Sequence, residues 1–188
     1  FASMAAYAFA RLKFPFRNQI FIGYLATMMI PYHVVLIPVY ILVNRLEWVD
    51  TYQGIIVPNL FSAFATFFLR QFFMTIPEEL EDAARIDGAG YLRIFWQIIL
   101  PLSKPALATI GIFVFMFGWN DFLWPLVVIN SLDKTTLPVG LAFFRGEYVV
   151  YWNLMMVATT ISVIPVVIAF LFAQRYFVQG IALTGIKD

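Results

Sequence analysis

The side chains that could do chemistry form one dense group and a few isolated positions. The dense group is the segment TIPEELEDAARIDGAGYLRIFWQIILPLSKP, residues 75–105, which carries charged residues between two apolar stretches. Elsewhere, Asp121 is the one carboxylate inside a long apolar stretch, and His33 is the only histidine. There is no cysteine, so a disulfide is impossible and a zinc or thiol site is strongly disfavoured. We expect no metal site and no catalytic residue.

Residues 75–105 are predicted to form two short helices. Thr75 is the expected N-cap of the first helix, with Glu78 as its capping-box partner three residues later. Gly88 and Gly90 are expected to end this helix, because glycine favours the backbone conformation that follows a helix C-terminus. The segment therefore predicts a helix, a tight turn and a second helix between two apolar stretches.

The first of these helices has a mostly small and apolar face. Leu80, Ala83, Ala84 and Asp87 follow i, i+3, i+4, i+7 spacing and so share one side of the helix. Such a face can approach a partner closely while neighbouring carboxylates pair with basic residues of that partner. A helix lying on a membrane surface usually carries Lys and Arg on its polar face, whereas this one is acidic. The pattern favours a docking element.

The sequence has no phosphate-binding loop of its own. The nearest string, residues 180–188, has glycines five positions apart followed by Ile-Lys-Asp. ATP binding by such a loop needs Gly-Lys-Ser/Thr, which places a lysine and a hydroxyl on the phosphates and Mg²⁺. The chain is therefore not expected to be an enzyme that hydrolyses ATP, and any ATP-driven process would need a partner.

Composition indicates a membrane protein. The chain of 188 residues is 62% hydrophobic and 12% charged, whereas soluble domains carry roughly a quarter charged residues. A bilayer core of about 30 Å needs roughly 20 apolar helical residues. Four stretches with at most one formal charge are candidates: 20–44, 51–69, 105–129 and 148–174. With an apolar stub ending near Ala10, the sequence predicts at least five crossings.

The predicted fold class is all-α, a polytopic transmembrane helical bundle. Residues 1–188 are interpreted as a single transmembrane domain, and one or more spans are expected before Phe1 because the chain opens on an apolar stub. The near-balanced net charge of +1 provides no basic field that would attract nucleic acid.

Orientation follows from the distribution of Lys and Arg, which collect in cytoplasmic loops. If the segment after the stub is cytoplasmic, only Arg45, Lys134 and Arg145 of the twelve Lys and Arg residues lie outside, which leaves nine inside. The loop after residue 75 and the C-terminus are then cytoplasmic, and the 130–147 loop lies outside. Several aromatic residues would fall near the outer interface, where amphipathic rings are favoured: Trp48, Trp119, Trp124, Tyr148, Tyr151 and Trp152.

Polar side chains within the predicted spans are candidates for a solute pathway. A carboxylate near mid-bilayer costs about 2.5 to 3.5 kcal/mol on insertion scales, and Asp121 lies about two turns from the outer end of its span. An interfacial cap or subunit contact is therefore favoured over solute or proton handling. For His33, a hydrogen bond to a carbonyl freed by Pro38 is favoured over a pathway role.

Neutral hydrogen-bonding groups in the spans suit either helix contacts or a hydroxyl-rich solute, and the sequence leaves both open. They are Asn59, Ser62, Thr66, Thr159, Thr160 and Ser162. Asn59, Ser62 and Asp121 are the candidate pathway residues.

The string EDAARIDGAGYLRIFWQIILP resembles the EAA loop of binding-protein-dependent ABC importers. That pattern is Glu-Ala-Ala, then Asp-Gly-Ala, then a helix that ends in an apolar residue, Leu and Pro. The matching positions here are Asp82, Ala83, Ala84, Asp87, Gly88, Ala89, Leu100 and Pro101. Asp82 replaces the usual Glu, which keeps the charge on a shorter arm, and Glu81 stands beside it. Three weaker strings, AYAFARLKFPF, WNDFLWPL and QRYFVQGIALTGIKD, resemble the carbohydrate branch, of the maltose-importer smaller-subunit type.

The resemblance implies a permease subunit of a bacterial-type plasma (inner) membrane that forms the pathway for a carbohydrate or related polyol phosphate. It implies a second, similar permease subunit, a cytoplasmic dimer of ATP-binding-cassette ATPases, an external solute-binding protein and a lipid bilayer as partners. ATP and Mg²⁺ would be used by the ATPase, and this chain would bind no cofactor. In the family the loop's short helix sits in an ATPase cleft and transmits its motion. The implied coupling loop is 75–101, with Glu81, Asp82, Ala83, Ala84, Asp87, Gly88 and Ala89.

Two other classes of membrane protein fit the sequence less well. An ion-coupled secondary transporter would need carboxylates or a charged pair at mid-membrane, and only Asp121 is available. An intramembrane enzyme would need a nucleophile with its base, or paired metal ligands, and one histidine without cysteine serves this poorly. The ion-coupled transporter is the main alternative.

Overall fold

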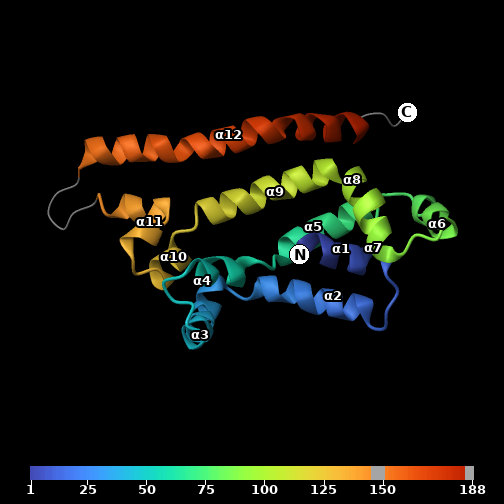
Figure 1. Cartoon of the computed structure of the whole chain (residues 1–188), viewed down its shortest axis with the longest axis horizontal. Coiled ribbons are helices and arrows are strands. Elements are labelled where there is room, and N and C mark those ends of the chain that lie inside the picture. The colour runs from blue at the N-terminus through green and yellow to red at the C-terminus, as the bar shows by residue number, and fades with distance from the viewer. Residues whose placement is uncertain (145–150, 185–188) are drawn as a thin grey trace. The chain divides into compact units, whose positions relative to one another are not determined.

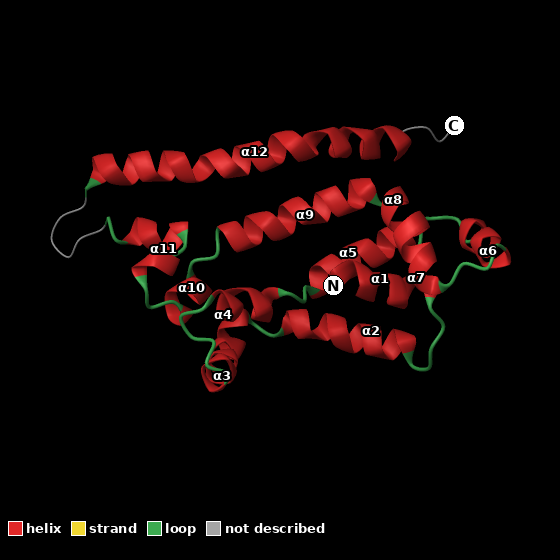
Figure 2. Ribbon diagram, in the orientation of Figure 1, coloured by secondary structure: helices red, strands yellow, loops and turns green. Residues whose placement is uncertain are grey.

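The computed structural model describes residues 1–144 and 151–184, and every regular element among them is a helix (Figure 2). The predicted all-α fold class is thereby confirmed. The predicted outer loop 130–147 and the C-terminal string QRYFVQGIALTGIKD lie partly outside the described residues. Arg145, Tyr148 and Lys187, which entered the prediction of orientation, lie outside them altogether.

The chain divides into two compact units, each built from separate stretches of sequence. The first comprises Phe1–Met29, Phe61–Ile112 and Ala173–Asp188, and the second comprises Ile30–Leu60 and Phe113–Phe172. That residues 1–188 form one transmembrane domain stays a prediction.

One described helix is long and apolar enough to cross a membrane by itself, namely the stretch Trp152–Phe172 of α12 (Trp152–Thr184). Three pairs of neighbouring helices meet the same requirement together, with a break of at most four residues between the members. They are Arg17–Met29 with Tyr32–Arg45, Tyr52–Asn59 with Ala63–Phe73, and Tyr91–Leu102 with Lys104–Trp119. The described residues thus offer up to four spans, each overlapping one of the four predicted stretches, and the fifth crossing stays a prediction.

The predicted stretch 105–129 does not form a single helix. Helix α9 (Lys104–Trp119) ends ten residues early, and the short helix α10 (Leu123–Val128) follows. At the break, the Asn120 side chain donates a hydrogen bond to the carbonyl of Met116, 2.7 Å away. Because Asn competes for backbone groups in this way, it favours the end of a helix over its interior.

The first unit is organised around a pair of helices. Helix α1 (Ala2–Arg11) packs along α5 (Ala63–Phe73), as Figure 1 shows. Ala6 and Ala65 are buried at this contact, and their small side chains let the two backbones approach closely. Helix α2 (Arg17–Ala26) also contacts α5. The remaining elements of this unit are α6 (Glu79–Ile86), α7 (Tyr91–Ile94), a π-helix (Phe95–Ile99), α8 (Leu100–Leu102) and the start of α9.

A single apolar core joins the elements of this unit other than α2. Tyr7 of α1, Leu69 and Phe73 of α5, and Phe95 and Ile99 of the π-helix are all buried in it. The core therefore connects the 75–101 segment to the α1 and α5 pair.

The second unit has a smaller core. Helices α3 (Tyr32–Arg45), α4 (Tyr52–Ile56), α10 and α11 (Leu137–Ala142) belong to it, together with most of α12. Val43, Trp124 and Val128 form the buried centre. The indole Nε1 of Trp124 donates a hydrogen bond to the carbonyl of Gly54, 2.9 Å away. Trp124 is thus a core residue of this unit, and its place near the outer membrane interface stays a prediction.

Candidate functional site

Helix α6 begins later than its sequence predicted. The Thr75 hydroxyl donates to the carbonyl of Phe72, 2.7 Å away, so it closes the end of α5 and does not open α6. Glu78 occupies the N-cap position, and its side chain makes no capping hydrogen bond. The capping box of Thr75 and Glu78 is therefore wrong. Glu79, Glu81 and Asp82 lie in the first turn, where negative charge is favoured by the helix dipole.

The end of α6 follows the prediction. Gly88 has φ of +80°, the left-handed conformation that favours glycine. The N–H of Gly88 donates to Arg85 O at 3.0 Å, and the N–H of Ala89 donates to Ala84 O at 2.9 Å. These two bonds form a Schellman motif, which satisfies the last carbonyls of the helix. Gly90 then stands at the N-cap of α7.

Glu81 is the buried residue of α6. Its side chain is 2% exposed, and its Oε1 lies 2.9 Å from Nε of Arg11, at the end of α1. Its Oε2 lies 3.3 Å from Arg85 and accepts a hydrogen bond of 3.4 Å from the hydroxyl of Tyr7. A buried carboxylate must be paired, and here the partners come both from its own helix and from α1.

The opposite side of α6 is exposed. Asp82, Ala83 and Asp87 are all exposed, and Ile86 has 87% of its surface exposed. Arg85 pairs with Asp82 at 2.7 Å on this open side. The residues predicted to share one face therefore divide, because Leu80, Ala83 and Asp87 are exposed while Ala84 is half-buried.

Two members of the predicted coupling loop hold the loop in place from inside. Ala84 and Ala89 are partly buried against the core of the first unit. Gly88 provides the turn between them. The loop thus presents an outer surface of Asp82, Ala83, Ile86 and Asp87 on a helix whose inner side is fixed by packing and by Glu81.

The three candidate pathway residues are each engaged with nearby backbone. The Asn59 amide donates to Ile55 O at 3.1 Å, and the Ser62 hydroxyl accepts from the N–H of Ala65 at 3.2 Å, where it caps α5. Asp121 Oδ1 accepts a long hydrogen bond, 3.4 Å, from the N–H of Trp124 in the first turn of α10. The structure thus gives Asp121 a capping contact, and the role of the three residues in a solute pathway stays a prediction.

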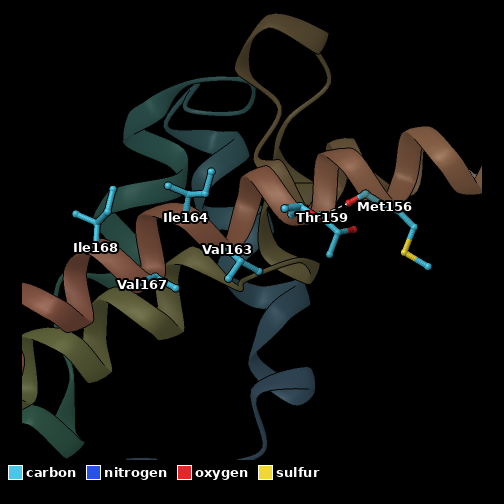
Figure 3. Close-up of a pocket in the computed structure, with 7 residues that line it drawn as sticks. Met156, Thr159, Val163, Ile164, Val167 and Ile168 are labelled. Atoms are coloured by element: carbon cyan, nitrogen blue, oxygen red, sulfur yellow. Dashed lines mark hydrogen bonds between the residues drawn. The ribbon is translucent and has the colours of Figure 1, made fainter.

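Other polar side chains of the predicted spans also form hydrogen bonds with nearby backbone. On α12 the hydroxyls of Thr159 and Thr160 donate to the carbonyls of Met155 and Met156, 2.7 and 2.8 Å away. Figure 3 shows Thr159, Val163 and Val167 in succession along α12, which alone lines a pocket. Because both hydroxyls bond their own helix, this surface is largely apolar.

His33 does not make the expected contact. Its ring lies 6.2 Å from that of Tyr32, edge-on, and its side chain is exposed. Within residues 1–144 and 151–184 the structure shows no hydrogen bond from His33 to a backbone carbonyl. In the same ranges no group of three or more His, Asp or Glu residues could hold a metal ion.

Two contacts were missed by sequence reasoning. The first is the pair of Arg11 and Glu81, 70 positions apart. The second is Asp50, between α3 and α4, whose carboxylate accepts from the N–H groups of Asn130 and Ser131 at 3.0 and 2.9 Å and from the Ser131 hydroxyl. Lys134 Nζ donates to Asp50 O at 2.8 Å. Hydrogen bonds from Ser131 and Asn130 lower the pKa of Asp50 well below its ordinary value.

The comparisons with known proteins agree with one another. The family model described as "Binding-protein-dependent transport system inner membrane component" matches residues 1–183. The arabinooligosaccharides transport system permease protein AraQ of Halalkalibacterium halodurans is 41% identical over 187 residues, which is 100% of this chain and 67% of that protein. The sn-glycerol-3-phosphate transport system permease protein UgpE of Escherichia coli is 42% identical over 180 residues, 95% of this chain and 64% of that protein.

A solved structure is similar over most of the chain. It is a bacterial ABC transporter involved in the import of the acidic polysaccharide alginate, with a TM-score of 0.82 and 28% identity over 93% of this chain and 67% of that chain. The chain spans about two thirds of the length of the proteins it matches. On the family match and on relatives about 40% identical, this chain belongs to the inner-membrane permease components of binding-protein-dependent ABC transport systems, which are transport proteins and not enzymes.

Proposed function

We propose that this chain lines part of the translocation pathway for a carbohydrate or related polyol phosphate in an ABC importer. The solutes named for its relatives, arabinooligosaccharides, sn-glycerol-3-phosphate and alginate, are all rich in hydroxyl groups, and this supports the class of solute. A second, similar permease subunit and an external solute-binding protein complete the pathway. ATP and Mg²⁺ are used by a separate dimer of ATP-binding-cassette ATPases.

The 75–101 loop and the C-terminus lie on the cytoplasmic side in this proposal. The distribution of Lys and Arg supports the orientation, since nine of the twelve would then be cytoplasmic. In this orientation α6 faces the compartment in which ATP is hydrolysed.

The observation that carries the proposal is the outer surface of α6. Ile86 is 87% exposed between the exposed carboxylates of Asp82 and Asp87, on a helix whose inner side is packed against the core. An exposed apolar side chain within a charged segment fits a partner with an apolar cleft and a basic rim. Because α6 is held from inside, a movement of the partner would displace the helix without unfolding it.

The test replaces the exposed apolar side chain with a charge. Ile86→Asp, introduced into the complete importer, should lower the amount of ATPase that co-purifies by at least about tenfold, as expected when a central apolar contact is lost. Leu132→Asp is the matched control, because Leu132 is 76% exposed in the other unit. Its complex should retain the ATPase.

The outcomes separate the hypotheses. Loss of the ATPase in Ile86→Asp alone, with normal amounts of the permease in the membrane, supports docking through α6. Full retention of the ATPase in Ile86→Asp would refute docking at this surface. A wild-type chain that purifies without any ATPase and transports solute without ATP would refute the importer function itself and favour the ion-coupled alternative.

A further inference from the structure

The guanidinium of Arg11 lies where three helices meet. Arg11 is the last residue of α1, and its side chain is only 5% exposed although the residue ends a helix. Its Nη2 donates to Phe73 O at 2.7 Å and to Ile76 O. Phe73 is the last residue of α5, and Ile76 lies in the turn that leads to α6. One cation therefore caps the negative end of α5.

The same guanidinium pairs with two carboxylates of the 75–101 loop. Its Nη1 lies 3.3 Å from Glu78, and its Nε lies 2.9 Å from Glu81. The Glu78 side chain is 82% exposed and the Glu81 side chain is 2% exposed. Attraction between charges is screened little in a buried setting, so the contact with Glu81 is the stronger of the two.

A second side chain of α1 reaches the same carboxylate. Tyr7 lies four residues before Arg11, on the same side of α1, and its hydroxyl donates to Oε2 of Glu81 at 3.4 Å. The Tyr7 ring lies 5.3 Å from that of Phe95 in the π-helix. Helix α1 thus holds the α6 segment at Glu81 through two contacts one turn apart.

Stability alone does not account for this arrangement. Replacing a buried ion pair by apolar residues of similar volume is often neutral or stabilising. An apolar pair at positions 11 and 81 would therefore fill the same space without the ion pair, although it would also remove the hydrogen bonds from Arg11 to the end of α5. The guanidinium links three elements at one point, because its hydrogen bonds go to the carbonyls of Phe73 and Ile76 at the end of α5 while its charge is paired with Glu81 of α6.

We propose that Arg11 is a positioning residue that passes displacement of α6 to α1 through its ion pair with Glu81. The inference rests on the proposed function, since it requires that a partner ATPase moves α6. It assigns the neighbouring carboxylates of α6 to different tasks: Asp82 faces outward toward the partner, and Glu81 faces inward toward α1.

The test removes the ion pair, together with the hydrogen bonds from Arg11 to the end of α5, while side chains of similar volume keep the packing. The double variant Arg11→Met with Glu81→Leu is built into the complete importer and reconstituted in vesicles with its ATPase and solute-binding protein. Solute uptake and ATP hydrolysis are measured together, and their ratio is the readout. The double variant should assemble with the ATPase and hydrolyse ATP, while solute transported per ATP falls by roughly 2- to 30-fold, the range for residues that couple distant sites.

Three results bear on the proposal. Lys13→Met removes an exposed positive charge two positions from Arg11 and should leave the ratio unchanged.

A double variant that assembles and transports as much solute per ATP as the wild type would refute the positioning role and leave the pair a purely structural one. If Arg11→Met alone is poorly folded but the double variant is not, and the low ratio persists in the double variant, the coupling role is supported independently of folding. Failure of the proposed function is distinguishable, because the wild-type chain would then bring no ATPase with it.

Discussion

Among the described glycines of the second unit, Gly54 is the one at which substitution by alanine should lower the stability most. A Cβ at this position would overlap the carbonyl oxygen of Trp48 and lie 3.2 Å from its carbonyl carbon. It would also lie 3.4 Å from a methyl group of Val128, in the core. The Trp48 carbonyl is held by the Thr51 hydroxyl at 2.7 Å, so it cannot move freely. Gly54→Ala must therefore shift backbone.

The expected size of the effect follows from two contributions. Overpacking a well-packed site typically costs about 1–3 kcal/mol. A shift of Gly54 also strains the hydrogen bond that Trp124 Nε1 donates to Gly54 O, which is worth roughly 1 kcal/mol. Together they amount to roughly 2–4 kcal/mol, or a Tm lower by about 4–16 °C for a chain of this size.

The assay is thermal unfolding of the purified protein in detergent, followed by tryptophan fluorescence, since Trp124 is buried at this site. Gly23→Ala is the matched control, because a Cβ at Gly23 would meet nothing within 4 Å. Gly23 lies inside α2, so alanine there should be neutral or stabilising by about 0.5–1 kcal/mol. A Gly54→Ala variant that melts at the wild-type temperature would refute the packing argument.

Two further predictions concern carboxylates outside α6. Hydrogen bonds from Ser131 and Asn130 lower the pKa of Asp50, so the stabilisation is present above about pH 4 and is lost as the pH falls through the lowered pKa. Asp50→Asn should lower the Tm at pH 7, and its difference from wild type should shrink below about pH 4; a difference that stays constant down to pH 3 would contradict this. Asp121→Asn keeps an oxygen that can accept the hydrogen bond from the N–H of Trp124, so solute uptake into vesicles should remain within about twofold of wild type. Complete loss of uptake, with normal amounts of the protein in the membrane, would show that the charge of Asp121 is needed.

Apolar length predicted which parts of this chain are helical, but it could not locate breaks within the apolar stretches. Hydropathy averages over many residues, whereas a break depends on single side chains. Asn120 bonds to the preceding turn, and Asp121 accepts from the next one, so α9 and α10 are separate helices. The pair Asn-Asp inside an apolar stretch was the available local indication of this break.

In the candidate site, too, the sequence predicted local features but not those that depend on tertiary packing. The glycine pattern located the end of α6 correctly, because a Schellman motif is formed by residues adjacent in sequence. Its beginning was misplaced, because the Thr75 hydroxyl is equally able to bond backward, to Phe72, and only the packing of α5 decides which bond forms. The partner of Glu81 is Arg11, which tertiary packing alone brings within reach.

The neighbouring carboxylates of α6, Glu81 and Asp82, have different surroundings: one is buried against α1 and the other is exposed. Successive residues of an α-helix are about 100° apart, so a buried Glu81 leaves Asp82 toward solvent, and the structure has this arrangement. The longer Glu arm extends to Arg11 across the interface with α1. The shorter Asp arm stays close to α6, 2.7 Å from Arg85. The aspartate that departs from the usual EAA pattern therefore changes the outward surface of α6 and leaves the inward ion pair intact. If α6 docks the ATPase as proposed, substitutions at Asp82 should change the amount of ATPase that co-purifies, whereas substitutions at Glu81 should change the solute transported per ATP.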